Sequence, residues 1–258
     1  MQIFDNIGAL ASYKDVILTI GSFDGVHGAH QKIIRRLTAI AEEVKGTSVV
    51  ISFYPHPRTV IDPDFQFTVI TTEDERNELL KQLGVDVLLR IPFTKEFAAL
   101  SYLDFVRLLA ENMDIHTIVL GYNHNFGKNR EGNAELLRIT AKEFNFQVVE
   151  IEKVLINSMS VSSTLIRKKM SAGKIAEVNS LLAYIYKLDV RIEKEIVKNH
   201  QFQISLLHPS KIFPAKGVFP IQIGQYNAEL CINDTISITF DKLAENIKIA
   251  EIYTIYFI

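Results

Sequence analysis

Short apolar runs alternate with amphipathic stretches over about the first 183 of the 258 residues. Runs of this length and composition are typical of buried β-strands. They lie at Val16–Ile20, Thr47–Tyr54, Val85–Ile91, His116–Leu120 and Gln147–Ile151. Apolar residues three and four apart, together with N-capping signals, predict helices between these strands. The helices are expected at Gln31–Lys45, from Thr72 to about Leu83, and from Ser101 to about Asn112.

Strands that alternate with helices in this way predict an α/β fold, with a parallel sheet covered by helices on both faces. Ligands of such sheets bind at the carboxyl ends of the strands. The loops after Ile20, Tyr54 and Leu120 are therefore the first places to search for chemistry.

The pattern changes after about Tyr184, where shorter β-rich runs show partial alternation. These runs lie at Phe202–Leu207, Val218–Ile223, Glu229–Ile232, Thr235–Phe240 and Glu251–Ile258. Prolines and the Asn233-Asp234 pair separate them, as in turns. We therefore expect two domains, residues 1–183 with the parallel sheet and residues 184–258 with a small antiparallel β-domain.

Composition excludes several classes of function. The 28 basic and 30 acidic residues leave a net charge of −2 without a polybasic block, which disfavours binding to nucleic acid or to an anionic membrane surface. The sequence contains no apolar stretch long enough for a signal peptide or a membrane span. The single Cys231 cannot form an internal disulfide or a metal cluster. We expect a soluble, cytoplasmic protein.

The segment GSFDGVHGAH, residues 21–30, connects the first predicted strand to the first predicted helix. Its glycines permit a tight turn, and free N–H groups at a helix start attract anions. His27 and His30 can donate hydrogen bonds to one phosphate chain, an arrangement that suits attack on the α-phosphate of a nucleoside triphosphate. A merely capped helix or a zinc pair is the alternative, although zinc needs further ligands. The strand–turn–helix context favours phosphate.

Three more segments lie where this chemistry would need them. In FYPHPR, residues 53–58, two prolines stiffen a loop whose aromatic, histidine and arginine side chains could contact a planar ring and a phosphate. The loop Gly121–Asn133 is rich in side-chain donors and converges on the same sheet edge. In SSTLIRKK, residues 162–169, Ser and Thr suit a helix N-cap, and Arg167 could clamp a departing pyrophosphate. Lys168 and Lys169 are expected on a solvated face.

In this order the four segments resemble the FMN adenylyltransferase module of the bacterial bifunctional riboflavin kinase/FAD synthetase family. The resemblance rests on GSFDGVHGAH, FYPHP, GYNHNFG and SSTLIR and covers about residues 14–183. It implies a nucleotidyltransferase-type, Rossmann-like domain that transfers AMP from ATP to FMN with Mg²⁺ and yields FAD and pyrophosphate. The β-domain would then be a reduced riboflavin-kinase barrel.

The resemblance also implies roles for individual residues. Catalytic roles fall on His27, His30, Asn123 and Arg167. Nucleotide binding falls on Gly21, Ser22, Phe23, Asp24, Gly25, Gly28, Ala29, Ser162, Ser163 and Thr164. The residues expected to bind the flavin are Phe53, His56, Pro57, Arg58, Asn125 and Phe126. No protein metal ligand is assigned.

Two departures from the family pattern matter. Ala29 stands where the family has glycine, and its methyl group could crowd the nucleotide. Residues 184–258 contain only Gly217 and Gly224 and lack the glycine-rich G-x-P-T-A-N stretch of the kinase module, so we expect no riboflavin kinase activity. A catalytically weak flavin-nucleotide-binding paralogue, or a nucleotidyltransferase with another phosphorylated acceptor, is the alternative.

Overall fold

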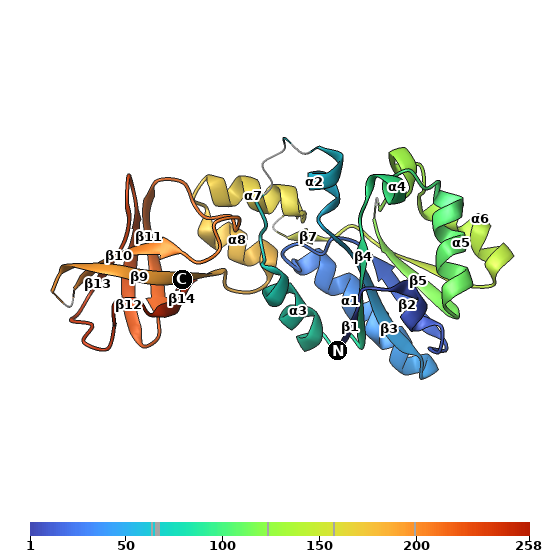
Figure 1. Cartoon of the computed structure of the whole chain (residues 1–258), viewed down its shortest axis with the longest axis horizontal. Coiled ribbons are helices and arrows are strands. Elements are labelled where there is room, and N and C mark those ends of the chain that lie inside the picture. The colour runs from blue at the N-terminus through green and yellow to red at the C-terminus, as the bar shows by residue number, and fades with distance from the viewer. Residues whose placement is uncertain (63, 65–67, 123, 157, 199) are drawn as a thin grey trace. The chain divides into compact units, whose positions relative to one another are not determined.

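The computed structural model describes residues 1–258 except 63, 65–67, 123, 157 and 199. The chain divides into two compact units, each considered by itself (Figure 1). The first comprises Met1–Phe67 and Glu73–Leu155, and the second comprises Thr68–Thr72 and Ile156–Ile258. These are units of packing, and the functional border expected between residues 183 and 184 stays a prediction.

The first unit is built on a six-stranded sheet in the order β1-β4-β3-β2-β5-β6. Every neighbouring pair is parallel, which confirms the predicted sheet. The strands are β1 (Gln2–Phe4), β2 (Val16–Ile20), β3 (Thr47–Tyr54), β4 (Val87–Pro92), β5 (Ile115–Gly121) and β6 (Gln147–Ile151). All residues of β2 are buried, because a parallel strand in the middle of such a sheet is covered on both faces.

Helices cover both faces of this sheet (Figure 1). On one face α1 (Gly28–Val44) and α3 (Glu73–Gln82) bury Ile34, Leu37 and Leu80 against Ile17 and Val50. On the other face α5 (Tyr102–Asn112) and α6 (Ala134–Phe144) supply a second core. Its members include Leu18, Val49, Phe105, Leu109 and Leu137. Alternate side chains of β2 and β3 therefore pack into two separate hydrophobic cores, one on each face of the sheet.

The helix starts agree with the sequence prediction in one case and differ from it in another. Ser101 caps α5 as predicted, with its Oγ accepting from the N–H of Asp104 at 3.1 Å. Helix α1 begins at Gly28 instead of Gln31, because the His27 side chain acts as its N-cap. Strand β1 and helix α6 were not predicted. The same holds for four short elements: η1 (Ile7–Leu10), α2 (Pro57–Ile61), α4 (Lys95–Ala98) and η2 (Lys128–Arg130).

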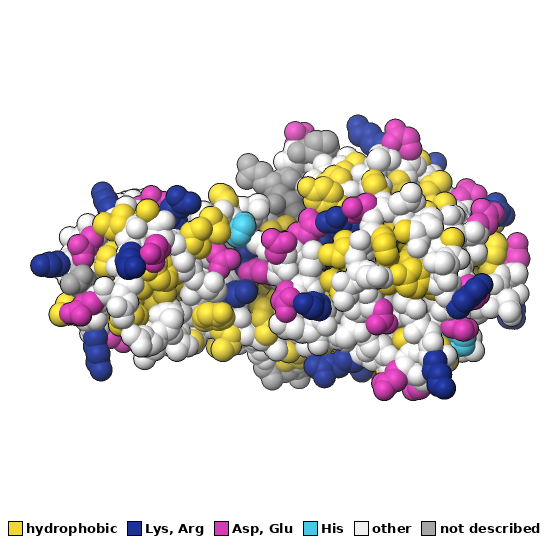
Figure 2. Space-filling view, turned by 60° about the horizontal axis from the view of Figure 1, so that its bottom comes forward, with side chains coloured by type: hydrophobic (Ala, Val, Ile, Leu, Met, Phe, Trp, Pro, Cys, Tyr) yellow, Lys and Arg dark blue, Asp and Glu magenta, His cyan; other side chains and the backbone are white. Residues whose placement is uncertain are grey.

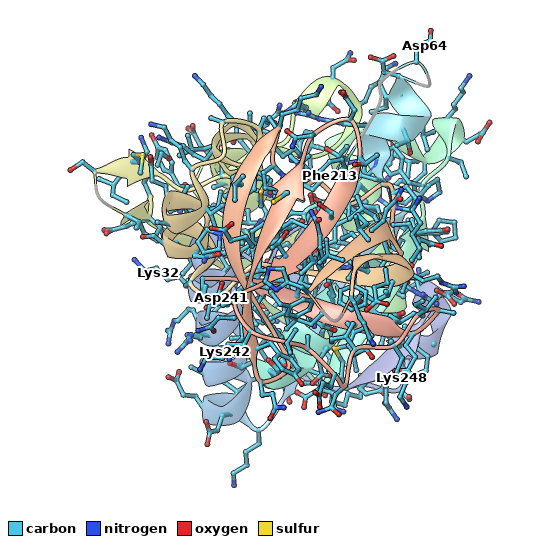
Figure 3. All side chains as sticks on the ribbon, turned by 90° about the vertical axis from the view of Figure 1, so that its left-hand side faces the viewer. Lys32, Asp64, Phe213, Asp241, Lys242 and Lys248 are labelled. Carbon is cyan, nitrogen blue, oxygen red and sulfur yellow. The ribbon has the colours of Figure 1, made fainter. Side chains whose placement is uncertain are left out.

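The second unit contains a closed antiparallel barrel in the order β10-β13-β12-β11-β14-β9. Its strands are β9 (Lys187–Val197), β10 (Gln201–Leu206), β11 (Gly217–Ile223), β12 (Tyr226–Ile232), β13 (Ile236–Phe240) and β14 (Ile252–Phe257). Asp241 and Lys242, labelled in Figure 3, follow β13 in the sequence. The antiparallel β-domain is confirmed, and β9, which was not predicted, closes the barrel by pairing with β10 and β14.

Shorter elements precede the barrel. They are β7 (Leu155–Ile156), β8 (Met159–Ser160), α7 (Ser163–Ser171) and α8 (Ile175–Leu182).

A segment from the first third of the sequence, Thr68–Thr72, also belongs to the second unit. The Val69 N–H donates to the Ser210 carbonyl at 2.9 Å, and the Ile212 N–H donates to the Val69 carbonyl at 2.8 Å. Between them Lys211, which is 2% exposed, donates through Nζ to the Lys187 carbonyl at 2.7 Å. Backbone hydrogen bonds thus hold this segment against residues 210–212, which lie far along the chain.

The surface carries charges of both signs. Figure 2 shows basic and acidic side chains interspersed over the face drawn. Among the helices of the described chain, none has both the length and the apolar content that a bilayer crossing requires.

Candidate active site

The loop between β2 and α1 holds an unusual backbone turn. The Val26 N–H donates to the Phe23 carbonyl at 3.0 Å, and Phe23, Gly25 and Val26 have φ angles of 49°, 84° and 35°. A left-handed conformation costs a residue other than glycine about 1–2 kcal/mol. The side chains of Phe23 and Val26 are buried in the α1-side core, which holds this turn in place. The backbone is thus strained where a helix N-terminus opens.

His27 and His30 stack at that N-terminus, with ring centroids 3.6 Å apart. The His27 Nδ1 accepts from the His30 N–H at 3.3 Å, so a neutral His27 ring carries its proton on Nε2. The His30 Nδ1 is buried without a partner. Burial lowers the pKa of His30 well below its usual value, and the charges of His27 and His124 lower it further. His30 is therefore neutral near pH 7.

His27 caps its own helix, as the structural alternative expected. The His30 Nδ1 lacks a partner, and phosphate binding by the histidine pair stays a prediction. In the part of the chain that the structure describes, no group of three or more His, Cys, Asp or Glu is placed to hold a metal ion.

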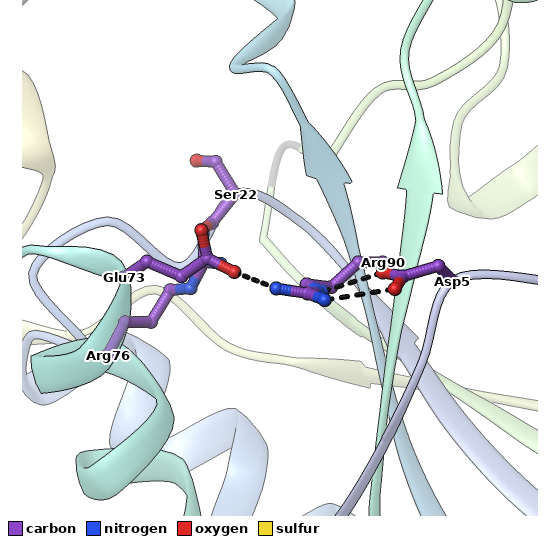
Figure 4. A network of polar contacts seen from close by, with 5 residues as sticks. All are labelled: Asp5, Ser22, Glu73, Arg76 and Arg90. Atoms are coloured by element: carbon purple, nitrogen blue, oxygen red, sulfur yellow. Dashed lines mark hydrogen bonds and ion pairs between the residues drawn. The ribbon is translucent and has the colours of Figure 1, made fainter.

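A polar network fixes the same loop from the side of α3 (Figure 4). Arg76 Nη1 donates to the Ser22 carbonyl at 3.4 Å. Arg90 forms a two-pronged pair with Asp5, at 2.7 and 3.0 Å, and also pairs with Glu73 at the start of α3. Burial lowers the pKa of Arg76, while the charges of Glu73 and buried Asp24 oppose that shift. Arg76 was not among the predicted site residues.

A pocket of about 690 Å³ opens beside the carboxyl ends of the strands in the first unit. Five of the six residues predicted for the flavin side line it: Phe53, Pro57, Arg58, Asn125 and Phe126. The sixth, His56, is not among the described lining residues. Its Nδ1 accepts from the Arg58 N–H at 3.3 Å and caps α2. The loop that was expected to be merely stiff is therefore a capped helical turn.

The pocket wall combines aromatic rings with cations. Phe53, Phe93 and Phe97 contact one another with centroids 5.5–5.7 Å apart. The cationic lining residues are Arg58, Lys95, Lys128 and Arg130, and none of the described lining residues is acidic. An apolar pocket with a few convergent polar groups is typical of a small-molecule site. This one suits a flat aromatic ligand that carries an anionic group.

The loop after β5 is anchored on the N-terminus of α5. Phe126 and Gly132 exchange two backbone hydrogen bonds, and the Tyr102 N–H donates to a Glu131 carboxylate oxygen at 2.9 Å. Gly127 has φ +74°, and a Cβ there would lie 2.8 Å from the Tyr102 backbone. Only glycine fits this approach. Asn123, predicted to be catalytic, lies outside the described residues.

His124 in this loop was missed by the sequence analysis. Its ring stacks near Phe126 at 6.1 Å and lines the pocket, and its Nε2 is buried without a partner. Burial lowers the pKa of His124 to about 4, with a further contribution from the charge of Arg130. The only sequence signal was its place in a loop already singled out.

The remaining predicted residues lie on α7, in the second unit. The Ser162 Oγ caps the helix by accepting from the Leu165 N–H at 3.2 Å, and Ser163 and Thr164 form its first turn. The Arg167 Nε donates to the Thr68 carbonyl at 2.9 Å. Lys169 is not simply solvated, because it pairs with Glu177 and lowers the pKa of that carboxyl.

Comparison with known proteins supplies independent information. The family model described as FAD synthetase matches residues 10–165. A FAD synthetase of Listeria monocytogenes is 33% identical over 179 residues, which span 68% of this chain and 72% of the relative. A bifunctional riboflavin kinase/FMN adenylyltransferase of Buchnera aphidicola is 28% identical over 244 residues, or 92% of this chain and 78% of the relative.

The fold has a solved counterpart as well. A crystal structure from Streptococcus pneumoniae, described as a macrolide-efflux protein, superposes with a TM-score of 0.87 and 24% identity. It covers 99% of this chain and 96% of the other, and at that identity the likeness concerns the fold alone. The family match spans more than half of the chain and includes the β2–α1 loop, the pocket and the β5 loop. The chain therefore belongs to the FAD synthetase family.

Proposed function

We propose that this protein is an FMN adenylyltransferase, which transfers AMP from ATP to FMN and releases pyrophosphate. The observation that carries the proposal is the aromatic, cation-lined pocket in the same unit as the strained helix opening with its two histidines. The family model and the FAD synthetase relative support it. The site residues assigned above belong to this proposal.

The reaction needs no covalent intermediate. A phosphate oxygen of FMN, ionised near neutral pH, attacks the α-phosphorus of ATP and forms the new P–O bond. The bond from that phosphorus to the bridging oxygen breaks, and its electron pair leaves with pyrophosphate. ATP enters as its Mg²⁺ complex, because Mg²⁺ in such sites is bound largely by substrate phosphates and water.

The chain supplies donors for the charge that develops. The His27 Nε2–H, the neutral His30 ring and the N–H groups at the start of α1 are assigned to the phosphates of ATP. Asp24 and Arg76 hold the turn that presents them. Ser163, Thr164 and Arg167 are assigned to the triphosphate tail through the family motif SSTLIR, and Asn123 to the attacking phosphate.

The pocket is assigned to the flavin. Phe53, Phe126 and Pro57 would cover the aromatic ring system, and Arg58 and Asn125, which line the same pocket, would bind polar groups of the nucleotide. The test is to incubate the purified protein with FMN, ATP and Mg²⁺ and to separate FAD by chromatography. FAD with an equal yield of pyrophosphate is expected. FMN returned unchanged, while another phosphorylated acceptor such as nicotinamide mononucleotide is adenylylated, would contradict the proposal.

The proposal includes the absence of riboflavin kinase activity in the barrel. Residues 184–258 contain only Gly217 and Gly224, which is too few for a glycine-rich phosphate loop. The side chains that point inward are apolar and buried, among them Phe202, Ile204 and Phe257. Riboflavin with ATP and Mg²⁺ is expected to yield no FMN. The same preparation must make FAD from FMN, which controls for a dead enzyme.

A further inference from the structure

Two buried imidazole nitrogens lack hydrogen-bond partners in the first unit. They are the His30 Nδ1 and the His124 Nε2, on two segments more than ninety residues apart in sequence. Buried polar atoms nearly always have a partner, so each exception requires an explanation. The proposed mechanism assigns His30 to ATP and leaves His124 without a role.

The backbone brings the two rings to one edge of the sheet. Strands β2 and β5 are parallel neighbours, so the loops that follow them leave from the same edge. Ile33 lies one turn after His30 on the same face of α1, and its Cδ1 would be 2.8 Å from a Cβ built on Gly121. The His124 N–H donates to the Gly121 carbonyl at 3.0 Å. The backbone of His124 therefore lies near the first turns of α1.

His124 also belongs to the wall of the flavin pocket. It lines that pocket together with Phe126, whose ring stacks near it, and with the cationic Arg130. His124 thus lines the pocket and is also close enough to His30 for its charge to lower the pKa of His30. A flavin nucleotide bound in this pocket would need its phosphate in this region in order to reach ATP.

We propose that His124 binds the phosphate group of the flavin nucleotide by donating a hydrogen bond from Nε2, and so fixes the attacking oxygen beside the His27–His30 pair. The inference rests on the proposed function and deepens it, because it names a residue that distinguishes FMN from riboflavin. A neutral donor suits this role, and burial keeps the ring neutral above about pH 4. Hydrogen bonds to an ionised acceptor are about twice as strong as neutral ones.

The test separates the phosphate from the ring system by comparing FMN with riboflavin, which lacks the phosphate. Binding of each is measured by flavin fluorescence for the wild type, His124→Phe and His124→Gln. We expect His124→Phe to weaken FMN binding by about 10- to 100-fold and to leave riboflavin binding unchanged. His124→Gln, which keeps an N–H at similar reach, is expected to restore most of the FMN affinity.

Kinetics give a second readout. The KM for FMN should rise in His124→Phe while the KM for ATP stays the same. His116→Gln is the matched control, because His116 is a half-buried histidine of β5 outside the pocket, with its Nδ1 2.8 Å from the Thr117 hydroxyl. Should His124→Phe lose riboflavin binding through misfolding, His124→Met offers a flexible side chain without the donor.

The outcomes are distinct. Equal loss of FMN and riboflavin binding in folded His124→Phe and His124→Met would give the ring a purely steric role and overturn the inference. FMN binding that survives in both variants would overturn it as well, even if the wild type makes FAD. A wild-type protein that binds neither flavin would overturn the proposed function first, and the inference with it.

Discussion

The two units differ in how they treat buried polar atoms. Within the described residues, every buried side-chain polar atom without a partner lies in the sheet unit, on His30, Ser52, Arg76, Asn77 and His124. In the barrel unit, buried Lys211 donates to the Lys187 carbonyl, and the buried Tyr186 hydroxyl donates to the Ile212 carbonyl. Unpaired polar groups weaken a fold, so their concentration in one unit marks where a ligand is expected.

The contrast implies that stability and activity can be changed separately. The barrel interior is apolar and closed, while the sheet edge combines unpaired nitrogens, a strained turn and a cation-lined pocket. A large substitution in the barrel should therefore lower stability without changing the chemistry. A small one at the sheet edge should do the reverse.

The largest effect is expected from Phe202→Ala in the barrel core. The Phe202 ring is fully buried and packs edge to face on Phe240 at 5.8 Å. Its removal should lower the free energy of unfolding by about 3–5 kcal/mol. Urea unfolding measures the loss, and FAD formation below the unfolding temperature should keep its wild-type kcat. A reduced kcat in fully folded protein would contradict the separation between the barrel core and the sheet edge.

His30→Ala is the opposite case. Removing one fixed donor to a developing charge lowers kcat by about 10²- to 10³-fold. The free energy of unfolding should fall less than in Phe202→Ala, because the ring loses its packing on His27 and Phe23 while its Nδ1 has no hydrogen bond to lose. Single-turnover FAD formation and thermal unfolding are measured on the same preparation. Near-normal turnover would remove His30 from the site.

Acid should weaken the sheet unit through its neutral histidines. The pKa of His124 is about 4 in the folded protein, below the ordinary value of 6.5, so the unfolded chain binds a proton first as pH falls. The free energy of unfolding therefore decreases between about pH 6.5 and pH 4, by up to about 3 kcal/mol from this ring. The lowered pKa of His30 acts in the same direction.

Urea unfolding near neutral pH and near pH 5 measures this dependence. His124→Gln should show a shallower dependence, since it lacks the titrating ring. If the free energy of unfolding changed equally with pH in the variant and in the wild type, His124 would not be held neutral by burial.

The smallest effect comes from two serines on β3. Ser52 is fully buried with an unpartnered Oγ, so Ser52→Ala should stabilise the protein by up to about 1 kcal/mol. Ser48 is its matched control, because its Oγ pairs with Asp86 at 2.6 Å and accepts from the Asp86 N–H at 2.9 Å. Ser48→Ala should destabilise by about 1–2 kcal/mol. Changes of opposite sign in the free energy of unfolding, measured with urea, would support the contrast between the two serines. Changes of the same sign would contradict it.

Periodicity and capping were enough to predict five of the six strands of the sheet and three of its covering helices, α1, α3 and α5. Short apolar runs such as Val16–Ile20, followed by a glycine turn, are typical of buried strands, and Ser101 is a standard cap. The start of α1 was misplaced because histidine is an uncommon N-cap. Strand β9 was missed because its second half, from Glu193 to Val197, is charged or exposed and loses the alternation that its first half shows.

The sequence predicted only those site residues that belong to a recognisable motif. Loop positions brought Phe53, Arg58 and Phe126 to one pocket, as expected from parallel topology. Arg76 and His124 acquire their place from burial and from contacts across the fold, which no local pattern encodes. The pairing of Val69 with Lys211 joins positions far apart in sequence and has no signature in either segment.

That pairing limits how the gene can be divided. The chain enters the second unit for residues 68–72, returns, and enters it again after residue 155. A stop codon after the sheet would remove the partners of the Val69 N–H and carbonyl and the Arg167 donor to Thr68. Deleting the barrel in one evolutionary step would therefore damage the fold upstream of the cut, which favours retention of the barrel independently of any catalytic activity of its own.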